Sequence, residues 1–463
     1  MSVTNAANRM LSSFRIAVGA DDDGSAVDLR PGGSLPSAFL VSDLAQASIG
    51  VAGSALSGFV AATGDGRSPS VTVDRDLASA WFAWSLRPEG WDLPAPWDVV
   101  AGDYAGDDGW LRIHTNAPHH RAAALTVLGV PGAREAVAEA VARWKVEDLE
   151  SAIVEAGGAA AALRTAEEWD AHPQGSAVAA EPLVHREPAS TGRRAGTGHV
   201  DPSRPLAGVR VLDLTRVLAG PVATRLLAGW GADVLRIDPP GWDEPGLIPE
   251  VTLGKRCAHM DLTAEGSRER FLELLTGADV LVHGYRPGAL DNLGLGPDVR
   301  DEARPGLVDV SLDAYGWSGP WSGRRGYDSL VQMSSGIAHA GMVAAASDRP
   351  VPLPVQALDH ATGYLLAACA LTGLAQRHEV GLGSRWRTSL ATMARVLSDA
   401  GVGSSIQGSG IDPPGPAPDA PVEQTTWGPA RRLPPPLMVD GAPLQWDLPA
   451  SPLGTVEPAW LEE

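Results

Sequence analysis

The sequence predicts an α/β protein that contains a doubly wound parallel sheet and, earlier in the chain, a small α+β domain. Apolar strand-like segments alternate with amphipathic helix-like segments from residue 208 to residue 312, a pattern typical of a parallel sheet with helices on both faces. Residues 108–158 instead carry one strand pattern followed by two helix patterns. A chain of 463 residues with 44% hydrophobic residues can bury more than one core.

The first units of the expected sheet have clear boundaries. The segment GVRVLDLT at 208–215 is typical of a buried strand, and PVATRLLAGWG at 221–231 is typical of a helix. Pro221 suits the first turn of that helix, where a missing N–H group leaves no hydrogen bond unmade. The segment ADVLRID at 232–238 supplies the next strand.

The alternation continues downstream. The segment TAEGSRERFLELLTG at 263–277 predicts an amphipathic helix with Thr263 as its N-cap. ADVLVHGY at 278–285 and GLVDVSL at 306–312 supply further strands. We therefore expect residues 206–400 to form a doubly wound, Rossmann-like sheet, which binds ligands outside the carboxyl ends of its strands.

The N-terminal half predicts a different architecture. DGWLRIHTN at 108–116 resembles a half-exposed strand, and two amphipathic helices follow at 131–145 and 146–158. This order indicates a small α+β domain over residues 86–175.

Composition defines the remaining segments. Residues 1–35 are polar and rich in Gly and Asp, and we expect a flexible N-terminal segment. Residues 36–85 carry an apolar helix headed by Asp43. Residues 176–205 contain Gly, Pro, Ser and Arg without apolar periodicity, as a linker does. Residues 401–463 are proline-rich, which predicts an extended tail.

Charge and cysteine content exclude several classes of function. A net charge of −20 repels polyanions and argues against a nucleic-acid partner or an anionic membrane surface. We expect no bilayer-spanning stretch and no signal peptide at the start of the sequence. Cys257 and Cys369 are too few for a disulfide framework or a thiolate metal cluster. The sequence therefore predicts a cytoplasmic protein without a metal site.

An internal repeat places an aspartate at the head of two apolar helices. Residues 42–82 parallel residues 358–397, with an Asp-headed helix, a Gly-containing turn, a short strand and a second helix in each copy. Asp43 heads the first helix and Asp359 heads the second. The simplest role for such an aspartate is an N-cap. A duplicated or permuted gene would explain the repeat.

The strand-end loops carry cations rather than a familiar catalytic motif. The loop at 215–221 lacks the G-x-G-x-x-G fingerprint of nicotinamide and flavin folds, and the sequence contains no Walker, H-E-x-x-H, G-x-S-x-G or C-x-x-C motif. Either the cations bind a phosphate-rich ligand beside tyrosines that could stack on a base, or they are ordinary surface residues. The residues concerned are Arg216, Lys255, Arg256, Arg286, Arg324 and Arg325, with Tyr285, Tyr315 and Tyr327.

Five segments in register resemble the class III CoA-transferases, the family of formyl-CoA and carnitine CoA-transferases and of the related α-methylacyl-CoA racemases. They are LAGVRVLDLTRVLAGPVATRLLAGWGADVLRID, GKRCAHMDL, ADVLVHGYRPGALDNLGLG, GWSGPWSGRRGYDSLVQMSSG and PVQALDHATGYLLAACALTGL, over about residues 206–397. Residues from GDYAGDDGWLRIHTN to EEWDAHPQG are similar to the small domain of the family, which normally follows the Asp-headed helix. The resemblance therefore implies a member with its halves in permuted order.

The resemblance implies that Asp359 is the nucleophile of a CoA transfer between an acyl-CoA and a free carboxylic acid, whereas Asp43 is only a helix cap. It implies no permanently bound cofactor, since coenzyme A and acyl-CoA are substrates, and it implies an interlocked homodimer. Tyr327 stands where the racemases have a proton-transferring histidine, which favours transfer. An acyl-CoA racemase or isomerase and a non-catalytic CoA-binding subunit remain alternatives. The CoA-binding residues carried over are Val217, Ala219, Lys255, Arg256, Tyr285, Arg325 and Tyr327.

Overall fold

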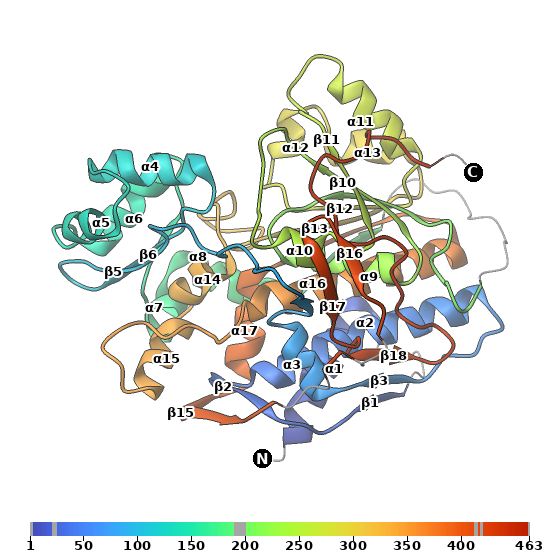
Figure 1. The fold of residues 1–463 in the computed structure, drawn as a ribbon, viewed down its shortest axis with the longest axis horizontal. Coiled ribbons are helices and arrows are strands. Elements are labelled where there is room, and N and C mark those ends of the chain that lie inside the picture. Colours follow the sequence, from blue (N-terminus) through green and yellow to red (C-terminus); the bar gives the residue numbers. More distant parts are fainter. Residues whose placement is uncertain (1–2, 21–25, 189–200, 412–414, 417–419, 462–463) are drawn as a thin grey trace.

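A seven-stranded sheet organises the larger part of the molecule (Figure 1). The computed structural model describes residues 3–20, 26–188, 201–411, 415–416 and 420–461. The strands are β8 (His185–Pro188), β9 (Arg210–Leu214), β10 (Asp233–Asp238), β11 (Lys255–His259), β12 (Val280–His283), β13 (Val308–Asp313) and β14 (Ser384–Ser389). Their order is β11-β10-β9-β12-β13-β14-β8, and every neighbouring pair is parallel except the edge pair β14–β8. The large parallel sheet predicted from the sequence is therefore present.

Alternating strand residues bury both faces of this sheet. Val211 and Val234 pack into a core shared with α9 (Ala219–Gly229) and α16 (Ala357–Val380). Their neighbours Leu212 and Leu235 point to the other face, where Phe271 of α11 (Ser267–Thr276) covers them. A side-chain period of two places successive residues on opposite faces, so β9, β10 and β12 each contribute to two cores. The connecting helices are α10 (Ile248–Val251), α12 (Ala289–Asn292), α13 (Pro297–Ala303), α14 (Asp328–Ser334), α15 (Ile337–Ala344) and α17 (Leu390–Asp399).

Helix α11 begins later than the sequence predicted. Its N-cap is Gly266, and Thr263 lies outside the helix. The Thr263 hydroxyl and N–H both donate to Asp261 Oδ1, at 2.6 and 2.9 Å. This local turn competes with helix formation and moves the start of the helix. The prediction of Thr263 as an N-cap was therefore wrong.

The small domain has its own sheet and core (Figure 1). Strand β6 (Trp110–Ile113) pairs antiparallel with β5 (Gly102–Ala105) and β7 (Ala160–Ala162). One face is covered by α4 (Pro118–Leu128), α5 (Arg134–Val141) and α6 (Val146–Glu155). Helices α7 (Ala166–Ala171) and α8 (Pro173–Ala180) connect this domain to β8 of the large sheet. The expected linker, residues 176–205, thus contains regular structure up to Pro188. Residues 189–200 of this linker lie outside the described residues.

The described part of the N-terminal segment, residues 3–20 and 26–35, contains regular structure, contrary to the prediction of a flexible segment. Helix α1 (Val3–Val18) presents Met10, Phe14 and Val18 to the core, with Phe14 fully buried. These residues recur every four positions and form one apolar stripe, a pattern that average polarity conceals. Strand β1 (Val27–Leu29) pairs with β3 (Val71–Val73), and the remaining N-terminal elements are β2 (Ser34–Phe39), α2 (Val41–Thr63), α3 (Arg75–Trp81) and β4 (Leu86–Pro88).

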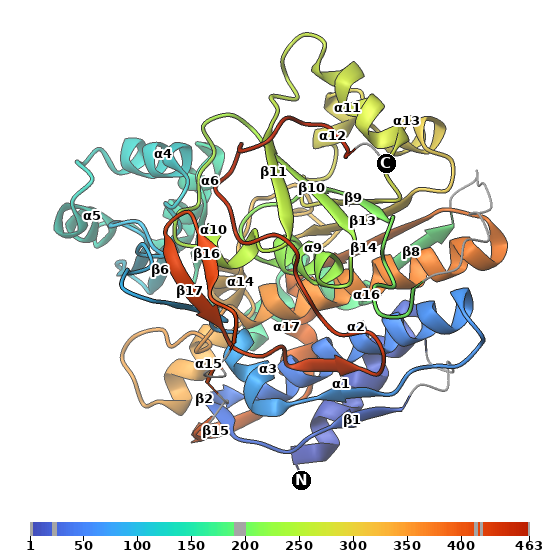
Figure 2. The same cartoon turned by 45° about the vertical axis from the view of Figure 1, so that its right-hand side comes forward.

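The proline-rich tail also forms strands, so its predicted extended character was only partly correct. Strand β15 (Val402–Ser409) pairs with β2, β17 (Gly428–Arg432) pairs with β4, and β18 (Leu437–Val439) pairs with β3. The short β16 (Glu423–Thr425) completes the second of these sheets. Among the described prolines of the tail, Pro429 lies within β17 and the others lie outside the strands. The C-terminal segment therefore completes sheets of the N-terminal one (Figure 2).

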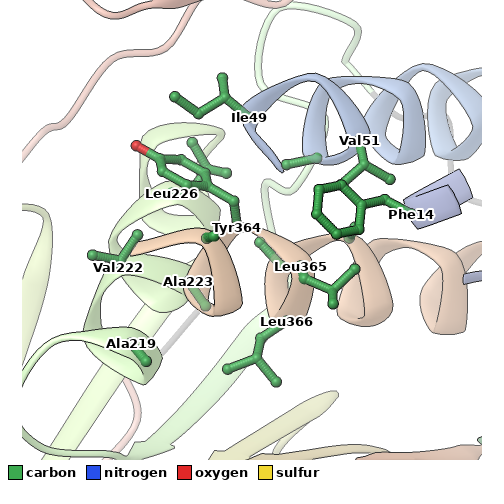
Figure 3. Packing of buried hydrophobic residues seen from close by; sticks show 14 of the residues in the cluster. Phe14, Ile49, Val51, Ala219, Val222, Ala223, Leu226, Tyr364, Leu365 and Leu366 are labelled. Carbon is green, nitrogen blue, oxygen red and sulfur yellow. The ribbon is translucent and has the colours of Figure 1, made fainter. Parts of the chain in front are cut away.

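Helix α16 lies between α9 and α2 (Figure 3). Tyr364 and Leu365 of α16 belong to the same core as Ile49 and Val51 of α2 and Val222 of α9. Helix α2 is the one described helix long and apolar enough to cross a membrane, and 83% of its apolar window is buried inside the molecule. The sequence expectation of no such stretch overlooked α2, which is a core helix here.

Candidate active site

A cavity of about 440 Å³ lies at the carboxyl ends of β9, β12 and β13. The loops at 214–219, 284–286 and 312–314 line one side, and residues 324–327 line another. The first turn of α4 adds His119 and His120 from the small domain, and α16 adds Asp359. Ligands of parallel α/β sheets bind at this edge. The cavity therefore combines residues of both domains within one chain.

Asp359 heads α16 without capping it. The N-cap is Gln356, which makes no side-chain capping bond. The Asp359 N–H group instead donates to Asp328 Oδ2 at 2.9 Å, and Gln332 donates to the other Asp328 oxygen. Asp328 thus serves the helix terminus from a different helix, which leaves the Asp359 carboxyl at the cavity wall. The predicted capping role of Asp359 was wrong.

The Asp359 carboxyl is buried beside other acids. Burial raises its pKa well above the usual value, and the charges of Asp328 and Glu244 raise it further. Burial likewise raises the pKa of Asp328 to about 6, although the N–H of Asp359 and the amide of Gln332 oppose the shift. Among the described residues, no cation forms an ion pair or hydrogen bond with Asp359. A buried carboxyl without a counter-ion is costly to maintain and is typical of functional sites.

Three arginines at the cavity have no acidic partner. Arg216 lies over the rings of Trp242 and Tyr285, at 4.8 and 5.5 Å, and donates to the Tyr285 hydroxyl at 3.3 Å. Arg286 and Arg325 are likewise free of ion pairs within the described part of the chain. Arg324 differs, because it donates to Glu150 at 2.7 Å. Unpaired guanidinium groups at a cavity favour a phosphate or carboxylate ligand.

Arg325, His120 and Tyr327 form a chain of hydrogen bonds. Arg325 can only donate, so His120 Nε2, at 3.1 Å, accepts. We therefore assign the His120 proton to Nδ1, which lies 3.3 Å from the Tyr327 hydroxyl and donates to it. Burial, His119 and Arg325 lower the pKa of His120 to about 3, so the ring is neutral. Tyr327 then keeps its own proton available for a ligand, because its oxygen already accepts.

The loop after β9 is held in an unfavourable conformation. Val217 has a φ of 63°, in the left-handed region that β-branched residues avoid. Its N–H donates to Glu244 Oε1 at 2.8 Å, while Arg236 lies 3.2 Å from the other Glu244 oxygen. Such strain costs on the order of 1–3 kcal/mol and persists where surrounding contacts enforce it. Ala219 follows at the start of α9 and also lines the cavity.

The cavity brings together six of the eight predicted site residues. Lys255 is not among them, because its ammonium is buried against Asp213 Oδ2 and the Pro221 carbonyl, both at 3.0 Å. Arg256 pairs with Asp233 and the Ala459 carbonyl. Lys255 is aligned with Val234, near the amino end of the sheet and away from the cavity. The predicted contact of these two cations with phosphates is therefore not supported.

Other site residues escaped the sequence prediction. Asp328 follows Tyr327 in the RRGYD segment. It accepts a hydrogen bond from the N–H of Asp359 at the start of α16, a contact that the segment alone does not indicate. His119 and His120 lie more than 200 positions before Arg325 in the chain, and no local pattern indicates that contact. His360, the residue after Asp359, is buried and stacked on Phe82 with ring centroids 5.0 Å apart, and it does not line the cavity.

Part of the chain matches a known protein family. Residues 206–417 match the family model described as CoA-transferase family III. The match confirms the predicted family.

Individual relatives match part of the chain. The probable fatty acyl-CoA transferase Rv3272 of Mycobacterium tuberculosis is 33% identical over 47% of this chain and 58% of its own length. The succinyl-CoA:glutarate CoA-transferase of Mus musculus is 35% identical over 40% of this chain and 44% of its own. A crystal structure of Rv3272 matches at 34% identity, with a TM-score of 0.39, over 43% of this chain and 57% of that one. The chain spans about half the length of the curated relatives that it matches.

Proposed function

We propose that the protein transfers coenzyme A from an acyl-CoA to a free carboxylic acid, with Asp359 as the nucleophile. The observation that carries this proposal is the buried Asp359 carboxyl, which has no cationic partner but shares its cavity with three unpaired arginines. The match of residues 206–417 to CoA-transferase family III supports the same reaction class.

Two acyl exchanges on Asp359 account for the reaction. The Asp359 carboxylate attacks the thioester carbonyl and the carbon–sulfur bond breaks. CoA thiolate is released, and a mixed aspartyl anhydride remains on Asp359. The thiolate then attacks the aspartyl carbonyl, which releases the first acid and forms an aspartyl-CoA thioester. The incoming acid reverses both steps and leaves as the new acyl-CoA. One thioester replaces another, so the exchange needs no external energy source.

The surroundings of Asp359 suit these steps. Arg216, Arg286 and Arg325 would hold the diphosphate of CoA, with Tyr285 beside the adenine. The free Tyr327 proton would stabilise the negative charge that develops on the carbonyl oxygen. Asp328 holds the backbone of Asp359 in place. Binding of the thioester would displace water and make the ionised carboxylate more reactive.

We propose that one chain completes this site, since His119 and His120 of the small domain line the cavity together with Asp359. The homodimer and the cytoplasmic location expected from the sequence remain proposals. Sedimentation equilibrium at micromolar concentration tests the first, and fractionation of the native host tests the second.

Covalent trapping tests the reaction. Incubation with acyl-CoA, treatment with hydroxylamine and peptide mapping should mark Asp359 alone. Asp359→Asn should fold and lose at least about a thousandfold in transfer rate, because an amide cannot form the anhydride. Asp43→Asn is the matched control, because it makes the same substitution at the third residue of the other long helix, and it should remain active.

Three results would contradict the proposal. The first is a labelled Asp43 or an active Asp359→Asn enzyme. The second is solvent deuterium at the α-carbon without an acceptor acid, which would indicate a racemase or isomerase. The third is CoA binding without turnover, which would indicate a non-catalytic subunit.

A further inference from the structure

A second cavity, of about 240 Å³, adjoins the first. Val217, Trp242 and Tyr327 line both cavities and form their common wall. Residues 95–98 and 114–117 of the small domain face residues 242–247 of the large one across this space. The two cavities therefore meet at Tyr327, next to the space that a group attached at Asp359 would occupy.

Aromatic and apolar groups dominate the second cavity. The His114 ring stacks on Tyr327 with centroids 3.7 Å apart and planes 3° apart, and its edge faces Trp97 at 5.8 Å. Burial, His120 and Arg112 lower the pKa of His114 to about 3, so this wall is uncharged. Further apolar lining comes from Ala95, Pro96, Ala117, Trp242, Pro245 and Leu247.

The charged residues of the second cavity all carry the same sign. Asp98, Asp243 and Glu244 line it, and none of the described lining residues is Lys or Arg. Three nearby cations are engaged by acids, since Arg112 pairs with Asp103 at 2.7 Å, Arg121 lies 3.6 Å from Asp98 and Arg236 lies 3.2 Å from Glu244. Arg216, which has no acidic partner among the described residues, lines the first cavity and not the second. A carboxylate placed here would lose its water without gaining a cation.

We propose that the second cavity binds the acyl group and selects an uncharged aromatic or short branched acyl group over one with a second carboxylate. This inference rests on the proposed function, because it concerns the acyl group transferred at Asp359. An apolar cavity of about 150 Å³ accommodates benzene, so about 240 Å³ holds one ring with a short linker. The stacked His114 and Tyr327 rings offer a flat face to such a group.

Competition between acceptor acids tests the selection. With acetyl-CoA as donor at pH 8, where all the acids are ionised, benzoate and phenylacetate are compared with succinate and glutarate. We expect kcat/KM for the aromatic acids to be at least about tenfold higher, equivalent to about 1.4 kcal/mol.

Two substitutions locate the selectivity. Asp243→Arg places a cation at the second cavity, where Asp243 is exposed and accepts a hydrogen bond from the N–H of Glu244 at 2.9 Å. It should raise the glutarate-to-benzoate ratio at least about fivefold. Asp261→Arg is the matched control, because Asp261 is also exposed and accepts from a nearby N–H but lies outside both cavities.

Trp97→Ala should enlarge the cavity and shift the preferred acid from benzoate towards 2-naphthoate. Trp91→Ala is its matched control, because Trp91 lies in the same segment of the chain as Trp97 but outside the cavity, where it stacks on Trp427. Equal or better use of glutarate by the wild type, or ratios unmoved by both Asp243→Arg and Trp97→Ala, would overturn the inference while Asp359 is still labelled. Absence of transfer to every acid, with Asp359 unlabelled, would instead overturn the proposed function.

Discussion

Helices α2 and α16 begin alike but differ in what surrounds their aspartates. Each carries an aspartate as its third residue, each is buried along most of its length, and the two pack against one another. Asp43 forms an ion pair with Arg75 at 2.7 Å, and both side chains are about 2% exposed. Asp359 faces a cavity and the like charges of Asp328 and Glu244. Among the described residues, the same residue at the same position thus has a cationic partner in one copy and none in the other.

The helix that follows each copy supplies the difference. Asp74 caps α3 and Ser389 caps α17, each by accepting from the N–H group three residues on. The first helical residue after the cap is Arg75 in α3 and Leu390 in α17. Leu390 lines the Asp359 cavity. The identity of the first residue after the cap therefore decides whether the aspartate of that copy has an arginine beside it.

The largest effect is expected when the second copy is made to resemble the first. Leu390→Arg would place a guanidinium at the cavity of Asp359, where pairing lowers the pKa of the carboxyl and occupies its oxygens. We expect the rate of CoA transfer to fall by about a thousandfold. Steady-state transfer kinetics measure the loss, and hydroxylamine trapping should show no labelled Asp359.

Leu390→Met is the control, because it keeps an apolar side chain of similar volume and should remain within about threefold of wild type. Full activity of Leu390→Arg would show that the missing cation is not what keeps Asp359 reactive.

The reverse change should unfold rather than inactivate the protein. Arg75→Leu leaves Asp43 buried without its partner, and breaking a buried pair from one side costs about 3–5 kcal/mol. Urea denaturation measures the loss. The expected loss in the free energy of unfolding exceeds the ~1 kcal/mol of a helix cap, because Asp43 pairs with Arg75 and makes no capping bond.

The double variant Asp43→Leu/Arg75→Leu should recover most of that stability, since both charges are then removed together. A double variant as unstable as Arg75→Leu would mean that packing, not charge, makes Arg75 necessary.

Local pattern predicted the large sheet because its strands β9, β10 and β12 bury alternate residues on two faces. It predicted Asp359, Val217 and Tyr327 at the cavity through a resemblance of motifs along the chain. It could not predict that Arg75 neutralises Asp43, because that bond joins residues 32 positions apart through tertiary packing. Lys255 was misplaced for the same reason: its position in the strand pairing, rather than its neighbours in sequence, decides which end of the sheet it faces.

The hydrogen-bonded Tyr327 shares the first cavity with Asp359. Tyr327→Phe removes the proton that would meet the developing oxyanion, while His114 can still stack on the ring. We expect kcat to fall about a hundredfold with little change in KM, because that bond strengthens only in the transition state. His120→Ala should give a smaller loss, since His120 acts by orienting Tyr327. An unchanged kcat in Tyr327→Phe would remove Tyr327 from the mechanism.

The smallest effect concerns stability and pH. Burial and the neighbouring acids raise the pKa of Asp359, and the pKa of Asp328 rises to about 6. A raised pKa in the folded state means that the neutral acid is favoured, so this stability is present at low pH and is lost as pH rises through the raised values. Asp359→Asn removes the buried acid and its repulsion of Asp328. We expect the variant to be more stable than wild type by about 1 kcal/mol at pH 8, with a smaller difference at pH 5.

Thermal denaturation of both proteins across this range measures the difference. Asp43→Asn should instead lose stability at both pH values, because it leaves Arg75 without its carboxylate. The two asparagine variants thus separate an aspartate that stabilises the fold from one that destabilises it. If the gap between Asp359→Asn and wild type narrowed with rising pH, Asp359 would already be ionised and compensated in the folded protein, and the contrast with Asp43 would fail.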